Sequence, residues 1–70
     1  MADVTASMAG TVLGVLVSEG DNVSSGQELV KLESMKMEIP IESEGDGEVA
    51  EVKVNEGDFV NEGDVLVVLK

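Results

Sequence analysis

Hydrophobic and polar residues alternate over several short segments of this chain, with the period of two that is typical of β-strands. Val52 and Val54 flank Lys53, which predicts the two valines on the inner face of a strand and the lysine on the outer face. The corresponding inward pairs in the first half of the chain are Val15 with Val17 and Val30 with Leu32. In the C-terminal segment, one face would carry Val65, Val67 and Leu69, and the other Leu66 and Val68.

The strand pattern occurs twice along the chain, as an internal repeat. Residues 10–33 recur without a gap as residues 47–70, at an offset of 37 positions, and 12 of the 24 aligned positions are identical. Two copies of one unit are expected to share one conformation. The sequence therefore predicts two similar halves related by an internal quasi-two-fold symmetry.

Extending the alignment backwards gives units that run roughly from 1 to 33 and from 38 to 70, within a single domain of residues 1–70. Only residues 34–37 belong to neither unit. Lys36 therefore lies at the crossing point of the predicted symmetry.

Bends and turns also fall at matched places. Val12 and Val49 are out of phase with the valines three positions further on, which predicts a β-bulge or sharp bend near 13–14 and near 50–51. The turn signals are Glu-Gly-Asp at 19–21 and at 56–58, followed by Gly26 and Gly63. Each unit should thus contain about four short strands.

Residues 25–38 also fit a helix, because Ser25 and Glu28 resemble a capping box and the segment is rich in helix-forming residues. The repeat favours a strand instead, because the partner segment at 63–69 is rich in β-branched residues. We therefore predict a strand over residues 27–33.

The segment 34–37 then becomes the hairpin turn that joins the two units, with Lys36 at its tip. Pro40 falls early in the strand that follows, a position that favours the start of a strand or the edge of a sheet. Packed face to face, the two four-stranded units would form a flattened antiparallel β-barrel or sandwich, a barrel-sandwich hybrid with a valine and leucine core.

Composition excludes several functions. The chain has 70 residues, no cysteine and no histidine, which removes disulfides, thiolate metal sites and the usual general base. Its formal net charge of −11 disfavours nucleic acid and anionic membrane surfaces. No hydrophobic stretch reaches membrane-spanning length and the N-terminus lacks a secretion signal, which predicts a cytoplasmic protein.

The candidate site is Lys36 with Met35 and Met37 on either side. A lysine on a turn is usually only a solvated surface residue. Methionines on an exposed turn add little to a core, however, and suit a recognition surface, although they could also cap the end of the barrel. An amine raised on a hairpin between two rigid halves is accessible to covalent modification.

These residues carry a resemblance to a known family. Glu33-Ser34-Met35-Lys36-Met37 is similar to the Glu-Ala-Met-Lys-Met signature of biotinyl domains, and the chain looks most like the small free-standing biotin/lipoyl attachment proteins of bacteria. Further similar elements are Met8-Ala9-Gly10, Glu19-Gly20-Asp21, Gly26-Gln27, and Gly57-Asp58 with Gly63. The chain departs from the family at Ser7 and Ala9, where many members carry prolines, and at Ser34, where the signature has alanine. It also lacks room for the inserted thumb of some carboxylase carriers.

The resemblance implies a carrier that is not itself an enzyme. A biotin protein ligase would join biotin to Lys36 through an amide, with Met35 and Met37 beside it, and the arm would shuttle carbon dioxide between a biotin carboxylase and a carboxyltransferase. The chain would act as a monomer. The acceptor is left open among acyl-coenzyme A, pyruvate and urea, as is whether the chain is a whole protein or part of a longer carboxylase.

Three rival functions stay open at this point. A lipoyl carrier shares the fold and the hairpin lysine, with lipoate in place of biotin, but lipoyl domains typically flank that lysine with aspartate and alanine. A structural adaptor would leave Lys36 unmodified. A calcium module is suggested by Glu42, Glu44, Asp46 and Glu48, although the spacing of a calcium loop is missing.

Overall fold

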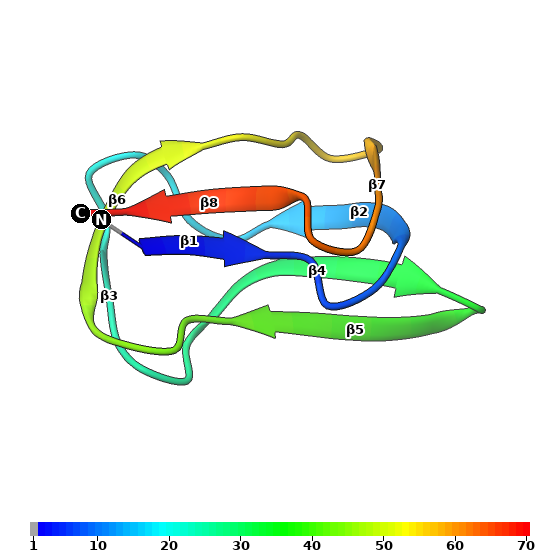
Figure 1. Ribbon diagram of the computed structural model, residues 1–70, viewed down its shortest axis with the longest axis horizontal. Coiled ribbons are helices and arrows are strands. Elements are labelled where there is room, and N and C mark those ends of the chain that lie inside the picture. Colours follow the sequence, from blue (N-terminus) through cyan, green and yellow to red (C-terminus); the bar gives the residue numbers. More distant parts are fainter. Residues whose placement is uncertain (1) are drawn as a thin grey trace.

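The computed structural model describes residues 2–70, and within that range it contains eight β-strands and no helix. The strands are β1 (Ala2–Thr5), β2 (Gly10–Val15), β3 (Asn22–Val23), β4 (Glu28–Ser34), β5 (Met37–Glu42), β6 (Gly47–Val52), β7 (Phe59–Val60) and β8 (Val65–Leu69). They form two four-stranded antiparallel sheets, with the orders β1-β8-β6-β3 and β5-β4-β2-β7 (Figure 1). The prediction of an all-β sandwich is confirmed, and the two sheets do not close into a barrel.

The repeat is visible in the strands themselves. β2 and β6 have equivalent bounds at the offset of 37 positions, and so do β3 and β7. Replacing each strand by its equivalent in the other unit converts the order of the first sheet into that of the second. The first unit was predicted to begin at residue 1, which lies outside the described residues.

One expectation about the packing of the units is wrong. The units do not each form one sheet, because successive strands of a unit alternate between the two sheets, so that each sheet takes two strands from each unit. The short connections cross from one sheet to the other and leave the apolar residues of each unit facing a shared interior. One unit alone therefore has no closed core, and the two halves stabilise each other.

Four similar turns lie in the connections that pass from one sheet to the other. In each one, a glycine in the left-handed region, with φ between +85° and +94°, is followed by a residue whose side chain accepts a hydrogen bond from the backbone N–H three positions earlier. The four glycines are Gly20, Gly26, Gly57 and Gly63. The predicted turn positions are confirmed.

The turns also join the two units. The backbone N–H of Gly20 donates to the Val49 carbonyl at 2.9 Å, and Val49 donates back to Asp21 at 2.8 Å. At the symmetry-related place, Gly57 donates to Val12 and Val12 donates to Asp58, both at 2.8 Å. Each pair of bonds therefore ties a turn of one unit to a strand of the other within the same sheet.

The predicted bends are present. The register of β2 against β4 shifts between Val12 and Gly14, and that of β6 against β8 shifts between Val49 and Glu51. Val12 and Val49 are each only 1% exposed, because the bulges turn them into the core.

The C-terminal strand departs from the predicted alternation. Leu66, Val67, Val68 and Leu69 are all buried. Leu66 and Val67 both face the core because the register of β8 against β1 skips a residue, and β4 shows the equivalent shift at Leu29. Val68 stays covered on the outer face because β8 lies between β1 and β6, opposite Asp3 and Glu51.

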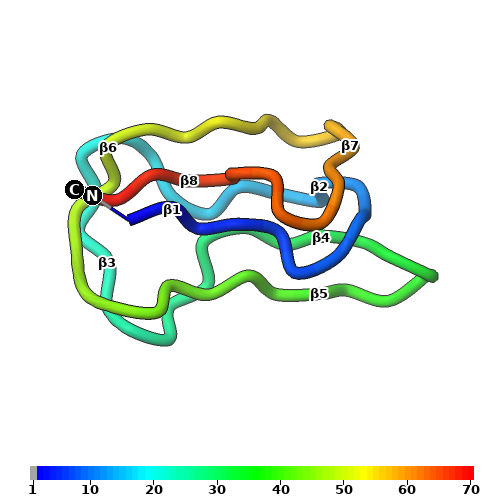
Figure 2. Tube along the Cα trace, in the orientation of Figure 1, coloured from blue at the N-terminus to red at the C-terminus, as the bar shows by residue number. Residues whose placement is uncertain are grey.

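Strand β5 is the edge of its sheet, which explains how it accommodates Pro40, because proline is tolerated where no further strand needs its N–H. The two ends of the described chain lie together at the opposite end of the molecule from the β4–β5 hairpin, and Ala2 pairs with Leu69 (Figure 2). The molecule is 31 Å along its longest axis.

Candidate functional site

The β4–β5 hairpin ends in a two-residue turn. Ser34 and Met37 form the last cross-strand pair, which leaves only Met35 and Lys36 in the turn. Both have positive φ, 54° and 64°, and they are the only non-glycine residues with positive φ among those described. A two-residue hairpin turn with this backbone is type I′, in which asparagine and glycine are the preferred residues.

This turn is strained. A left-handed backbone costs a residue with a Cβ atom on the order of 1–2 kcal/mol. The conformation persists because β4 and β5 are paired along their length, from Glu28 opposite Glu42 to Ser34 opposite Met37. Strained backbone conformations of this kind cluster at functional sites.

The base of the hairpin, at Glu33 where the pairing of β4 with β2 ends, is fixed by close packing. A Cβ atom on Gly10 would lie 2.5 Å from the Glu33 carbonyl oxygen, so that only glycine fits there. At the symmetry-related place, a Cβ on Gly47 would lie 3.3 Å from the Lys70 oxygen. The backbone at Glu33, near the hairpin turn, is therefore packed more tightly than the equivalent backbone at Lys70, near the chain ends.

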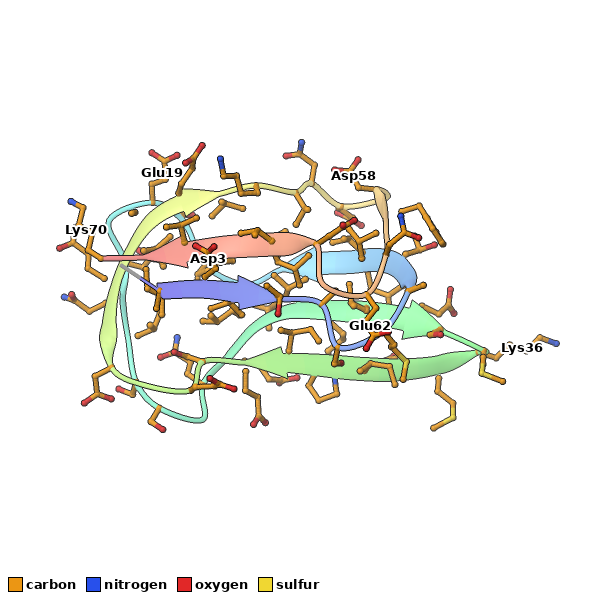
Figure 3. All side chains as sticks on the ribbon, in the orientation of Figure 1. Asp3, Glu19, Lys36, Asp58, Glu62 and Lys70 are labelled. Atoms are coloured by element: carbon orange, nitrogen blue, oxygen red, sulfur yellow. The ribbon has the colours of Figure 1, made fainter. Side chains whose placement is uncertain are left out.

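Lys36 differs from the other three lysines. Lys31, Lys53 and Lys70 each form an ion pair, with Glu38 at 3.5 Å, Glu51 at 3.1 Å and Glu48 at 3.6 Å. Among residues 2–70, no carboxylate lies within ion-pair distance of Lys36, which projects from the far end of the hairpin into solvent (Figure 3). Its amine is thus the least encumbered of the four.

The flanking methionines do not cap the sandwich. Met35 is 90% exposed and Met37 is 62% exposed. Their side chains therefore contribute little to the core. Sequence reasoning placed Met35, Lys36 and Met37 together on a hairpin, and the structure does so. It did not anticipate the left-handed turn, because neither Met35 nor Lys36 is a residue type that favours it.

Two of the four acidic residues considered for calcium are engaged elsewhere. Asp46 accepts a hydrogen bond from the Ser25 backbone N–H at 2.9 Å, and Glu48 pairs with Lys70. Within the described part of the chain, no group of three or more acidic side chains converges on a common point. Residues 2–70 also contain no helix long and apolar enough to cross a membrane.

Together, the sandwich and the hairpin have the architecture of a carrier module, with one exposed lysine at the far end of the molecule. The sequence model of the biotin/lipoyl family, described as "Biotin-requiring enzyme", matches residues 2–69, and the chain belongs to this family.

Two relatives match nearly their whole length. The chain is 58% identical over 66 residues to a biotin/lipoyl attachment protein of Bacillus subtilis, covering 94% of this chain and 90% of that protein. It is 48% identical over 67 residues to a homologue of a biotinylated protein in Mycobacterium leprae, covering 96% and 94% of the two chains.

A solved structure shows the same fold within a larger enzyme. A single-chain, multi-domain long-chain acyl-coenzyme A carboxylase superposes with a TM-score of 0.89 at 35% identity. The match covers 94% of this chain but spans only 7% of the length of that carboxylase.

Proposed function

We propose that the chain is a biotin carboxyl carrier in which Lys36 is biotinylated by a biotin protein ligase. The observation that carries this proposal is the position of Lys36, which is exposed, free of ion pairs among the described residues, and held at the tip of a strained turn between two exposed methionines. The whole of residues 1–70 acts as one carrier domain, with the hairpin 34–37 as its functional end.

The residues present fit covalent attachment of biotin. The deprotonated amine of Lys36 attacks the activated carbonyl of biotinyl-adenylate, an amide bond forms, and AMP leaves. Met35 and Met37 give the incoming enzyme an adaptable apolar surface on either side of the amine. The close approach of Gly10 to the Glu33 backbone holds β4 against β2 two residues before the turn.

Attached biotin supplies a ring that takes up carbon dioxide at one active site and transfers it at another, and the protein provides attachment and placement. The chain itself is a carrier and not an enzyme. Its partners are the ligase, a biotin carboxylase and a carboxyltransferase, and it works as a monomer in the cytoplasm. The likeness to an acyl-coenzyme A carboxylase supports partners of this kind.

The test is incubation of the purified chain with a biotin protein ligase, ATP and biotin, followed by intact mass and peptide mapping. We expect one added biotin, located on Lys36. A chain that gains no mass, or gains it on another lysine, contradicts the proposal.

A lipoyl carrier is the second candidate, supported by the name of the Bacillus subtilis relative, which covers both groups. The methionines beside Lys36 favour biotin, as does the Mycobacterium leprae relative, which is named as a homologue of a biotinylated protein. The two groups differ in mass, so that the intact mass of the chain isolated from cells separates them. An unmodified chain, negative on a streptavidin blot, would instead indicate a structural adaptor.

A further inference from the structure

The only aromatic residue of the chain is on its surface. Phe59 is 66% exposed, whereas Val60, the other residue of β7, is 3% exposed. Burial of a phenylalanine side chain would stabilise a fold, and the core of this small protein does not use that contribution. Single exposed apolar residues occur on most protein surfaces, but aromatic side chains are enriched at protein interfaces.

The repeat shows that the fold does not need an aromatic ring there. Asn22 of β3 is the equivalent of Phe59, and Val23 of β3 is buried as Val60 is. The two positions are structurally matched, yet one unit places a polar residue and the other an exposed ring. The short strand forms with either residue, so the fold does not require the ring.

Phe59 lies on the same face of the sheet as the residues at the base of the hairpin. It pairs with Thr11, which pairs on its other side with Glu33 of β4. Directly paired residues point to the same face of a sheet, and two strand spacings place Phe59 about 10 Å from Glu33. Glu33 precedes Lys36 by three residues. An enzyme that encloses the amine of Lys36 is well placed to reach this face.

The surroundings of the ring are acidic. Glu56, Asp58 and Glu62 flank β7 in sequence, and Asp58 and Glu62 lie at the hairpin half of the molecule (Figure 3). Glu33 has no ion pair or side-chain hydrogen bond among the described residues. A partner for this face must therefore offer an apolar pocket for the ring inside a basic rim.

We propose that Phe59 anchors the carrier to the biotin protein ligase, as the ring that fills an apolar pocket with basic residues around it. This inference rests on the proposed function of Lys36. Phe59 does not touch the reacting atoms. It holds the carrier on the ligase while the hairpin enters the active site.

The test compares two variants in which an exposed apolar residue is replaced by its equivalent from the other unit. Phe59→Asn copies Asn22, and Leu16→Lys copies Lys53. Leu16 is 53% exposed and lies opposite Leu29, at the far end of β4 from the hairpin. Initial rates are measured with ligase, ATP and biotin over a range of carrier concentrations.

We expect Phe59→Asn to raise KM for the carrier by about tenfold or more with kcat nearly unchanged, as removal of a docking anchor does. Leu16→Lys should leave both constants unchanged. Equal KM values for wild type and Phe59→Asn would overturn the proposal, and so would an equal rise in KM for Leu16→Lys, which would indicate general surface hydrophobicity.

Competition provides a second readout. Lys36→Arg protein should inhibit biotinylation of wild type, and the double variant Lys36→Arg with Phe59→Asn should inhibit it far less. A change in oligomeric size of Phe59→Asn by gel filtration would overturn the proposal, because the ring would then cover a second copy of the chain. If wild type itself is not biotinylated, the proposed function fails; if wild type is modified and Phe59→Asn behaves identically, only the docking proposal fails.

Discussion

Gly10 packs against the backbone of Glu33 so closely that a Cβ atom on Gly10 would lie 2.5 Å from the Glu33 carbonyl oxygen. Gly10→Ala must therefore displace β4 or β2 at the base of the hairpin. We expect this variant to lose about 2 kcal/mol or more of unfolding free energy, measured by denaturant melts.

Two other glycines provide graded controls for that variant. Gly47→Ala meets the Lys70 oxygen at 3.3 Å near the chain end and should cost less. Gly14→Ala meets nothing within 4 Å and should change stability by less than about 1 kcal/mol. A loss at Gly14 as large as that at Gly10 would show that glycine flexibility, and not packing, decides the effect.

Lys36→Arg should abolish biotin attachment and leave the fold intact, because a guanidinium stays protonated and is a poor acyl acceptor. Lys31, Lys53 and Lys70 should be dispensable, since each is held by a carboxylate and lies away from the hairpin tip. Peptide mass mapping of biotin to any of these three lysines would refute the assignment.

The exchange Lys36→Met with Met37→Lys tests whether position matters beyond exposure. It moves the amine from the turn onto β5, where residue 37 pairs with Ser34. A shift of one residue turns a strand side chain to the opposite face, so that the amine no longer meets the activated carbonyl. We expect the rate of modification to fall by about a hundredfold or more. Equal rates would mean that the ligase reads only exposure and local sequence.

Met35→Asn should stabilise the protein by about 1 kcal/mol, because asparagine tolerates the left-handed backbone that Met35 adopts at φ 54°. The 90% exposed side chain of Met35 contributes little to the core, so that nothing offsets the gain. Met37→Asn, on a strand, should show no such gain in thermal melts. Equal melting temperatures for Met35→Asn and wild type would indicate an unstrained turn.

The internal repeat predicts paired effects in the core. Val17 and Val54 are equivalent and are 7% and 8% exposed, so that each change to alanine should cost on the order of 1–3 kcal/mol. Lys53→Ala between Val52 and Val54 should cost little, because Lys53 is exposed and its ion pair with Glu51 is on the surface. A larger loss of unfolding free energy for Lys53→Ala than for the two valine changes, in denaturant melts, would reverse the assignment of inner and outer faces.

The strands could be predicted from the sequence because the repeat presents the pattern of each strand twice. The segment now seen as β4 carries helix-forming residues, and only its equivalence to β8 indicated a strand. The bulges near Val12 and Val49 were visible as a change of phase. Lys53, expected within a strand, lies one residue beyond the end of β6, although its backbone N–H still donates to the Leu66 carbonyl of β8 at 2.9 Å.

Other features left no local signal. The exchange of strands between sheets depends on where each connection crosses the sandwich, which alternation alone does not encode. The burial of Leu29 and Leu66 arises from register shifts against neighbouring strands. Phe59 looked like an ordinary strand residue, and only its pairing through Thr11 to Glu33 brings it towards the hairpin.

The pairing of Ala2 with Leu69 has a mechanical consequence. Any polypeptide joined at either end of the described chain meets the domain at one point, and the tip of the hairpin lies at the opposite end of a 31 Å body (Figure 1). The domain is then a rigid lever with a single pivot, and a small rotation at the pivot becomes a long sweep at Lys36. In the proposed carrier role, this rotation would add to the reach of the arm attached at Lys36.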